Sequence, residues 1–180
     1  MRFVPTPIDD LIEIHIERQH DGRGFFGRTY CFREFAERGL DFRPLQCSLS
    51  VTSRAATIRG FHFQSTPHRE AKLVQCVAGR VFDVALDLRR DSRTFGEHYA
   101  VELSAENATM IYIPKGCAHA FQTMADDTAI LYYISAEYVP DAARGIVWND
   151  PAVGVSWPLS DPVLSDRDRN LPYLADCRLD

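Results

Sequence analysis

A succession of short apolar runs between residues 45 and 135 is the feature that most constrains the fold. Eight segments rich in β-branched and aromatic residues follow one another there, at residues 45–51, 57–64, 71–77, 80–89, 98–103, 109–114, 119–124 and 129–135. Gly79, Gly116 and the pair Asp126-Asp127 separate some of these runs, and such residues favour turns. Many short strands at regular spacing are typical of a β-sandwich or barrel. We therefore predict an all-β jelly roll.

The flanking segments indicate how the rest of the chain is organised. Residues 1–7 are typical of an extended arm, residues 11–16 alternate like a strand, and residues 30–38 have helical spacing that ends at Gly39. The tail from Val139 contains Pro140, Pro151, Pro158, Pro162 and Pro172, so we expect an irregular segment packed on the barrel. A chain of 180 residues fits one domain, residues 1–180.

Charge and cysteine content exclude several classes of function. A net charge of -5 and an isoelectric point near 5.7 argue against a broad nucleic-acid-binding surface. No apolar run is long enough to span a membrane, and the N-terminus does not resemble a signal peptide. The five cysteines form no Cys-x-x-Cys pair, which argues against zinc-ribbon and thioredoxin-type sites. Their odd number, without a secretory signal, leads us to expect a reducing, cytoplasmic environment. Most of the cations are arginines, which suit bidentate contacts with phosphate.

The stretch Arg59-Gly60-Phe61-His62-Phe63-Gln64 places a cation, a glycine and an imidazole within four residues. In a strand, His62 and Gln64 would project from one face, and Phe61 and Phe63 from the other. The first face would carry chemistry and the second would pack in the core. The simpler alternative is a half-buried strand with one hydrogen-bonded histidine.

A metal-binding cupin is one interpretation of this stretch. The run Pro114-Lys115-Gly116-Cys117-Ala118-His119 matches the segment that supplies the last histidine ligand in such jelly rolls. However, Gln64 stands where the second histidine of the first metal motif should be, and an amide is a poor ligand beside histidine and carboxylate. We therefore expect neither a metal nor another cofactor.

Metal-free acid–base chemistry is the second interpretation. An imidazole with a pKa near 6.5 can remove a proton next to a ketone if cations or hydrogen-bond donors stabilise the enolate. A carboxylate on the far ring nitrogen would orient such a base. A tyrosine with a pKa near 10 can return a proton from the opposite face, which inverts the carbon. The chain offers His62, Lys72, His119 and Tyr132 in or beside strand runs.

From residue 21 to about residue 172, the chain resembles the dTDP-4-dehydrorhamnose 3,5-epimerase family. The resemblance rests on ordered motifs that include Asp21-Gly22-Arg23-Gly24-Phe25-Phe26, Arg59-Gly60-Phe61-His62-Phe63-Gln64, Lys72-Leu73-Val74-Gln75-Cys76, Ser92-Arg93-Thr94-Phe95-Gly96, Ile113-Pro114-Lys115-Gly116-Cys117-Ala118-His119, Trp148-Asn149-Asp150-Pro151 and Leu164-Ser165-Asp166-Arg167-Asp168. It implies a cupin-type jelly roll with a few short helices. It also implies a homodimer that exchanges N-terminal strands, within residues 1–20, and a dTDP-linked 4-keto-6-deoxy sugar as substrate.

The resemblance also implies roles for individual residues. His62 corresponds to the general base, Asp168 to the carboxylate that orients it, and Tyr132 to the general acid. Lys72 and His119 correspond to the groups around the C4 oxygen. The binding residues are the diphosphate contacts Arg23, Arg59 and Gln46, the base-stacking Tyr138, and three residues at the nucleotide end, Phe25, Glu34 and Arg167. We expect Asp83, Asp87, Arg89 and the Trp148-Asn149-Asp150 motif to serve the scaffold.

Three departures from the family pattern bear on the substrate rather than on the reaction. Ser48 follows Gln46 where asparagine is usual, Ala120 replaces the usual glycine, and Tyr133 stands where lysine is frequent. An epimerase of a single centre, C3 or C5, and an epimerase of a CDP- or GDP-linked 4-keto sugar remain alternatives. A cupin that binds a ligand without turnover is the alternative from a different class.

Overall fold

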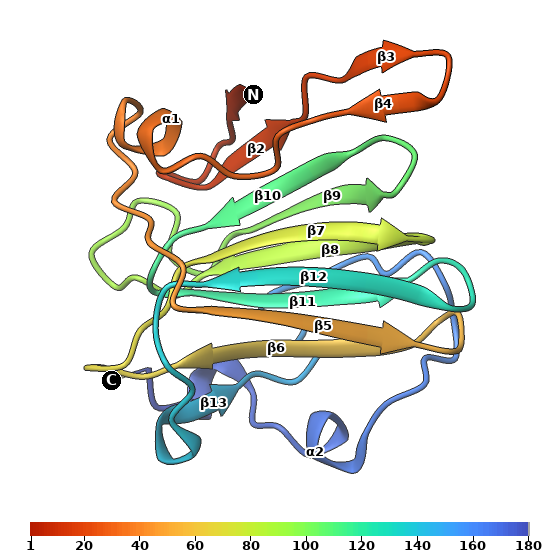
Figure 1. The fold of residues 1–180 in the computed structure, drawn as a ribbon. Coiled ribbons are helices and arrows are strands. Elements are labelled where there is room, and N and C mark those ends of the chain that lie inside the picture. Colours follow the sequence, from red (N-terminus) through yellow and green to blue (C-terminus); the bar gives the residue numbers. More distant parts are fainter. Residues whose placement is uncertain (180) are drawn as a thin grey trace.

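In the computed structural model, which describes residues 1–179, two packed antiparallel sheets form the body of the molecule. The first sheet has six strands in the order β1-β2-β10-β7-β12-β5, and the second has five in the order β13-β6-β11-β8-β9. Figure 1 shows the two layers. The strands are β1 (Arg2–Pro5), β2 (Ile12–His15), β5 (Gln46–Thr52), β6 (Ile58–Gln64), β7 (Lys72–Ala78), β8 (Arg80–Asp87), β9 (His98–Ser104), β10 (Thr109–Ile113), β11 (Cys117–Thr123), β12 (Thr128–Ile134) and β13 (Ala143–Gly145).

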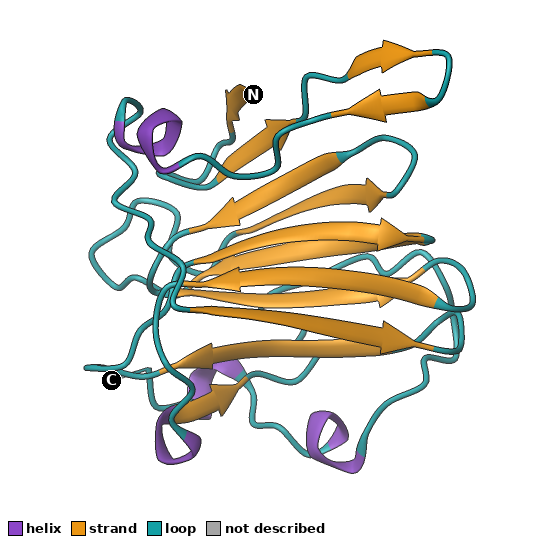
Figure 2. Ribbon diagram, in the orientation of Figure 1, coloured by secondary structure: helices purple, strands orange, loops and turns teal. Residues whose placement is uncertain are grey.

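Helices are few and short, as Figure 2 shows. They are α1 (Phe32–Ala36), α2 (Asp166–Arg169) and two 3-10 turns, η1 (Pro140–Ala142) and η2 (Leu174–Asp176). The expected all-β fold and the eight strands between residues 45 and 135 are confirmed, and the observed strand ends differ from the expected ones by at most two residues. The expected helix over residues 30–38 is only five residues long. None of the described helices is long and apolar enough to cross a membrane.

The hydrophobic core has three layers because each sheet is covered on its outer face as well. Between the sheets lies a cluster that includes Val74, Leu103 and Ile111, all fully or almost fully buried. Outside the first sheet, Phe35 from α1 and Phe42 pack on Leu73 of β7. Burial of this apolar surface is the main favourable contribution to folding.

The C-terminal segment covers the outer face of the second sheet. Phe61 and Phe63 of β6 belong to this layer, where Phe61 packs against Trp157. The buried carboxylate of Asp150 holds the segment together, because it accepts hydrogen bonds from the backbone amides of Ala152, at 2.8 Å, and Leu174, at 2.6 Å. These contacts place α2 beside β6, and α2 carries a residue of the candidate site.

A separate hairpin projects from the first sheet. It consists of β3 (Gln19–Asp21) and β4 (Gly24–Phe26), with a turn at Gly22 and Arg23. Figure 1 shows the hairpin at the top of the molecule, at the opposite end from β6, β13 and α2. The strands before it, β1 and β2, pair with each other, and β2 pairs with β10 of the same chain.

Candidate functional site

A β-bulge in β6 directs two site residues to the same side of the sheet. His119 of β11 pairs with His62, but Phe121 pairs with Arg59, so one extra residue of β6 lies between the two pairs. Cross-strand partners project from the same face, so Arg59 and His62 both face the first sheet although they are three residues apart. Simple alternation predicts His62 correctly but places Arg59 on the wrong face.

Glycine is required at the bulge. Gly60 has a φ of +118°, and an added Cβ would lie 2.4 Å from the carbonyl oxygen of His119. A side chain there would push β6 away from β11 and would displace both neighbouring site residues.

His62 and Asp168 form a hydrogen-bonded pair, although 106 residues separate them in the chain. His62 Nε2 lies 2.6 Å from Asp168 Oδ1; the aspartate side chain is 6% exposed and the histidine side chain is 35% exposed. Burial opposes ionisation of Asp168, but the hydrogen bonds to His62 and Ser165 outweigh burial and lower the pKa of Asp168 below its usual value. The carboxylate is therefore ionised at neutral pH and can orient the imidazole.

A capped turn of helix positions this carboxylate. Ser165 precedes α2, and its hydroxyl oxygen accepts a hydrogen bond of 3.0 Å from the backbone amide of Asp168. Serine is a favourable residue at such a position because its oxygen satisfies an otherwise unpaired amide.

Lys72 lies at the start of β7, close to the same histidine. Its amine donates a hydrogen bond of 3.2 Å to the carbonyl oxygen of His62 and forms an ion pair of 3.2 Å with Glu70. The lysine side chain is only 12% exposed. A buried, oriented ammonium of this kind can stabilise a negative oxygen on a bound ligand.

A second histidine–carboxylate pair lies deeper between the sheets. His119 Nε2 is 2.8 Å from Asp83 Oδ2, with exposures of 5% and 0% for the two side chains. The ring of Tyr132, on β12 of the other sheet, lies edge-on to His119 with the centroids 5.9 Å apart. Burial, with a smaller contribution from Asp83, raises the pKa of Tyr132 far above its usual value, and Arg59 opposes this only weakly. The phenol therefore keeps its proton at neutral pH.

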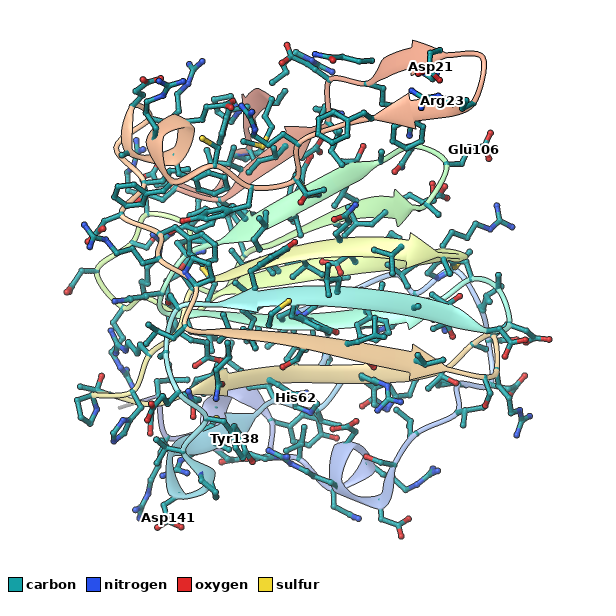
Figure 3. All side chains as sticks on the ribbon, in the orientation of Figure 1. Asp21, Arg23, His62, Glu106, Tyr138 and Asp141 are labelled. Atoms are coloured by element: carbon teal, nitrogen blue, oxygen red, sulfur yellow. The ribbon has the colours of Figure 1, made fainter. Side chains whose placement is uncertain are left out.

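An open pocket of about 170 Å³ leads to His62 and Lys72. It is lined by Gln46, His62, Phe63, Gln64, Glu70, Lys72, Ile134, Ala136, Tyr138, Ala143, Arg144 and Arg167. In Figure 3, Tyr138 lies near His62 at the lower end of the molecule. Arg144 and Arg167 form no ion pair with any residue in the range 1–179, so their positive charge is available to an anionic ligand.

Gln64 has a structural function in this pocket. Its amide nitrogen donates to the carbonyl oxygens of His68 and Glu137, and its oxygen accepts from the amide of Val139. These hydrogen bonds hold the segment that carries Tyr138. Across residues 1–179, no three side chains of histidine, cysteine, aspartate or glutamate are grouped as metal ligands.

The comparisons with known proteins agree with this architecture. A family model described as dTDP-4-dehydrorhamnose 3,5-epimerase matches residues 5–176. The chain belongs to this family. A dTDP-4-dehydrorhamnose 3,5-epimerase from Sinorhizobium fredii is 37% identical over 177 residues, which are 98% of this chain and 91% of the relative.

Two solved structures of epimerases show the same fold. The dTDP-6-deoxy-D-glucose-3,5-epimerase of Legionella pneumophila, in complex with dTDP-4-keto-L-rhamnose, has a TM-score of 0.92 and 36% identity, with 97% of this chain and 93% of that chain covered. A 3′-monoepimerase from Streptomyces bikiniensis, in complex with dTDP-quinovose, has a TM-score of 0.89 and 34% identity, with 95% and 87% covered.

Four of the expected binding residues of this epimerase-family chain do not line the pocket of their own chain. One is Arg59, whose Nε donates a hydrogen bond of 3.2 Å to the hydroxyl of Thr52. The other three are Arg23, Phe25 and Glu34. Arg23 and Phe25 are on the β3–β4 hairpin, where Arg23 pairs with Asp21 at 2.6 Å; Figure 3 shows this pair far from His62. Glu34 is on α1 and binds Arg28, at 3.1 Å, and the amino group of Met1. Within one chain these three residues therefore lie apart from the pocket that His62 lines, and their roles in substrate binding stay predictions.

Sequence reasoning also missed three residues of the site. Asp83 was expected to serve only the scaffold, yet it contacts His119. Glu70 and Arg144 were not assigned to the pocket, although both line it. Arg144 is brought there because β13 pairs with β6, a long-range contact that no local pattern indicates. The position of Glu70 two residues before Lys72 was an available signal, because residues i and i+2 of a strand share a face.

Proposed function

We propose that this protein inverts C3 and C5 of dTDP-4-dehydro-6-deoxy-D-glucose and so forms dTDP-4-dehydro-L-rhamnose. The observation that carries the proposal is the opposition of two groups. His62, oriented by Asp168 at 2.6 Å, lies on one sheet, and Tyr132 lies on the other. A sugar ring bound between the sheets would have a base on one face and an acid on the other.

The chemistry follows from this arrangement. His62 removes the proton next to the C4 ketone, and the electron pair moves onto the C4 oxygen as an enolate. Lys72 and His119 stabilise that negative oxygen by charge and hydrogen bonding. Tyr132 then protonates the carbon from the opposite face, which inverts it. Both carbons are adjacent to the ketone, so the same groups serve C3 and C5 once His62 has released its proton to solvent and Tyr132 has regained one.

The nucleotide is held by the outer part of the pocket. Tyr138 is 58% exposed at the rim, where its ring can stack on a thymine base. Arg167 and Gln46 line this part of the pocket and suit the diphosphate, because a guanidinium group binds phosphate oxygens in pairs. Ser48 lies next to this region on β5, where it pairs with Tyr132.

The homodimer is part of the same proposal. Phe25 and Phe26 of the hairpin are 51% and 73% exposed, and Leu49 and Val51 of the edge strand β5 are 61% and 60% exposed. Apolar surface of this extent supports an interface between two copies. In such a dimer, the hairpin of one subunit would bring Arg23 and Phe25 to the partner's pocket. The five free cysteines support a reducing, cytoplasmic location.

Product stereochemistry tests the number of inverted centres. The protein is incubated with dTDP-4-keto-6-deoxy-D-glucose, and the product is reduced with borodeuteride and hydrolysed to free sugars. Double inversion yields L-rhamnose and 6-deoxy-L-talose. Inversion at C3 alone yields 6-deoxy-D-allose and 6-deoxy-D-gulose, which would support the single-centre alternative. Recovery of only D-quinovose and D-fucose would contradict the epimerase proposal for this substrate.

The choice of nucleotide is tested by thermal shift with dTDP, CDP and GDP. A ligand that binds only the folded state raises the melting temperature. We expect dTDP to give the largest rise, and we expect Tyr138→Ala to remove most of it. A larger rise with CDP or GDP would contradict the assignment of thymine to this pocket.

A further inference from the structure

Glu70 is a buried carboxylate of the pocket that the proposed mechanism does not use. Its side chain is 7% exposed, and Oε1 lies 3.2 Å from Lys72 Nζ. Oε2 is fully buried and has no hydrogen-bond partner among residues 1–179. The residue lines the same pocket as His62 and Lys72.

The free oxygen needs a hydrogen-bond donor. A buried acceptor without a partner costs about 1–3 kcal/mol, and more when it is charged. The nearby donors are engaged elsewhere, because the amide nitrogen of Gln64 binds the carbonyls of His68 and Glu137. Arg144 Nη1 donates to the carbonyl oxygens of Asp141 and Ala143, and no atom of Arg144 forms a hydrogen bond with Oε2. A ligand in the pocket can supply the missing donor.

The position of Glu70 indicates which part of the ligand would supply the hydrogen-bond donor. Lys72 joins Glu70 to the carbonyl oxygen of His62 through contacts of 3.2 Å each, so Glu70 lies at the reacting end of the pocket. That end receives the sugar ring if the proposed function is right. The neutral donors of such a ring are its hydroxyl groups.

We propose that Glu70 recognises the sugar through both of its carboxylate oxygens. Oε1 positions the ammonium of Lys72, and Oε2 accepts a hydrogen bond from a sugar hydroxyl adjacent to C4. The proposal deepens the proposed function and rests on it for the identity of the sugar. It makes Glu70 a specificity residue for hydroxylated hexoses.

Calorimetric titration of dTDP and dTDP-glucose into the full-length protein tests this without turnover. In the unaltered protein, the glucose unit is expected to increase affinity over dTDP alone. In Glu70→Gln the ratio of the affinity for dTDP-glucose to that for dTDP should fall about tenfold, because a charge-assisted hydrogen bond is lost. The affinity for dTDP itself should stay within about twofold of that of the unaltered protein. The matched control is Glu137→Gln, an exposed glutamate beside the same pocket, and it should change neither value.

Two results would overturn the proposal. An unchanged ratio of the two affinities in Glu70→Gln would show that the carboxylate does not contact the sugar. An equal loss of affinity for dTDP and dTDP-glucose would assign Glu70 to the scaffold.

A measurement on the unaltered protein covers the case in which Glu70→Gln does not fold. A dTDP-hexose deoxygenated at C3 should bind about tenfold more weakly than dTDP-glucose, the effect of one lost hydrogen bond to a charged group. Equal affinities would contradict the proposal. Failure of the proposed function can be distinguished from failure of the Glu70 proposal. If the proposed function is wrong, the unaltered protein does not epimerise the sugar, whatever these titrations show.

Discussion

Asp83 Oδ2 lies 2.8 Å from His119 Nε2, in a position where neither side chain is appreciably exposed. This is the second histidine–carboxylate pair of the candidate site, because Asp168 binds His62 in the same way at 2.6 Å. The two histidines are cross-strand neighbours on β6 and β11. One pair reaches the open pocket, and the other lies deeper, against Tyr132.

Asp83→Asn should therefore impair the reaction. The amide cannot orient His119 as the carboxylate does, so stabilisation of the enolate weakens, and kcat is expected to fall about a hundredfold. Steady-state kinetics with the dTDP-4-keto sugar measure the effect, and the exposed Asp91→Asn serves as the control. Normal kcat in a folded Asp83→Asn protein would return Asp83 to a purely structural function.

Tyr132→Phe should separate proton removal from inversion. Burial raises the pKa of Tyr132 far above its usual value, so the hydroxyl is a proton donor throughout the neutral range. Its removal leaves His62 able to exchange protons, but inversion should slow by about 10²–10⁴-fold. Deuterium incorporation and product stereochemistry are followed in one sample. Equal slowing of the two would contradict the assignment of Tyr132 as the acid.

Asp87 should link the stability of the fold to pH. Burial opposes its ionisation, but Arg89, Ser92 and Thr94 outweigh burial and hold the pKa of Asp87 at about 2. The pKa of an aspartate in the unfolded chain is near 4. Because folding lowers this pKa, the carboxylate stabilises the folded protein at pH values above about 4, and the stabilisation is lost as the pH falls toward 2.

The corresponding variant is Asp87→Asn. At pH 7 it should lose about 2 kcal/mol of unfolding free energy, and its difference from the unaltered protein should shrink as the pH falls below about 4. Urea unfolding at a series of pH values measures the difference. A difference that stays constant between pH 7 and pH 3 would show that the charge of Asp87 is not responsible.

Mixing two inactive variants tests the exchanged hairpin. If Arg23 of one subunit completes the pocket of the other, a heterodimer of His62→Ala and Arg23→Ala chains contains one intact site. Random reassembly should then restore about a quarter of the sites. Activity of the mixture is compared with that of each variant alone. No recovery in a sample with demonstrated subunit exchange would contradict a shared site.

The succession of strands could be predicted from the sequence because each strand carries its own alternation and turn residues. The segment Thr109–Ile113, for example, is apolar and lies between turns, and it forms β10 as expected. The expectation that His62 and Gln64 face away from Phe61 and Phe63 also agrees with the cores in which the phenylalanines lie. Short-range patterns were sufficient for these features.

Other features depend on long-range contacts that periodicity does not contain. Arg59 shares a face with His62 only because β6 bulges against β11. Arg144 enters the pocket because the C-terminal tail returns to pair with β6. Arg23 and Glu34 were assigned to the pocket by resemblance alone, and the hairpin and α1 hold them elsewhere in their own chain. The proximity of His62 to Asp168 was expected from the family motifs and not from any local pattern.

Proton exchange is the most direct measurement of the central claim that His62 is the base for both carbons. The protein and His62→Ala are each incubated with dTDP-4-keto-6-deoxy-D-glucose in heavy water, and the C3 and C5 proton signals are followed by NMR. The unaltered protein should lose both signals, and His62→Ala should lose neither above the background rate. Loss of both signals at an unchanged rate in His62→Ala would contradict the assignment of His62 as the base.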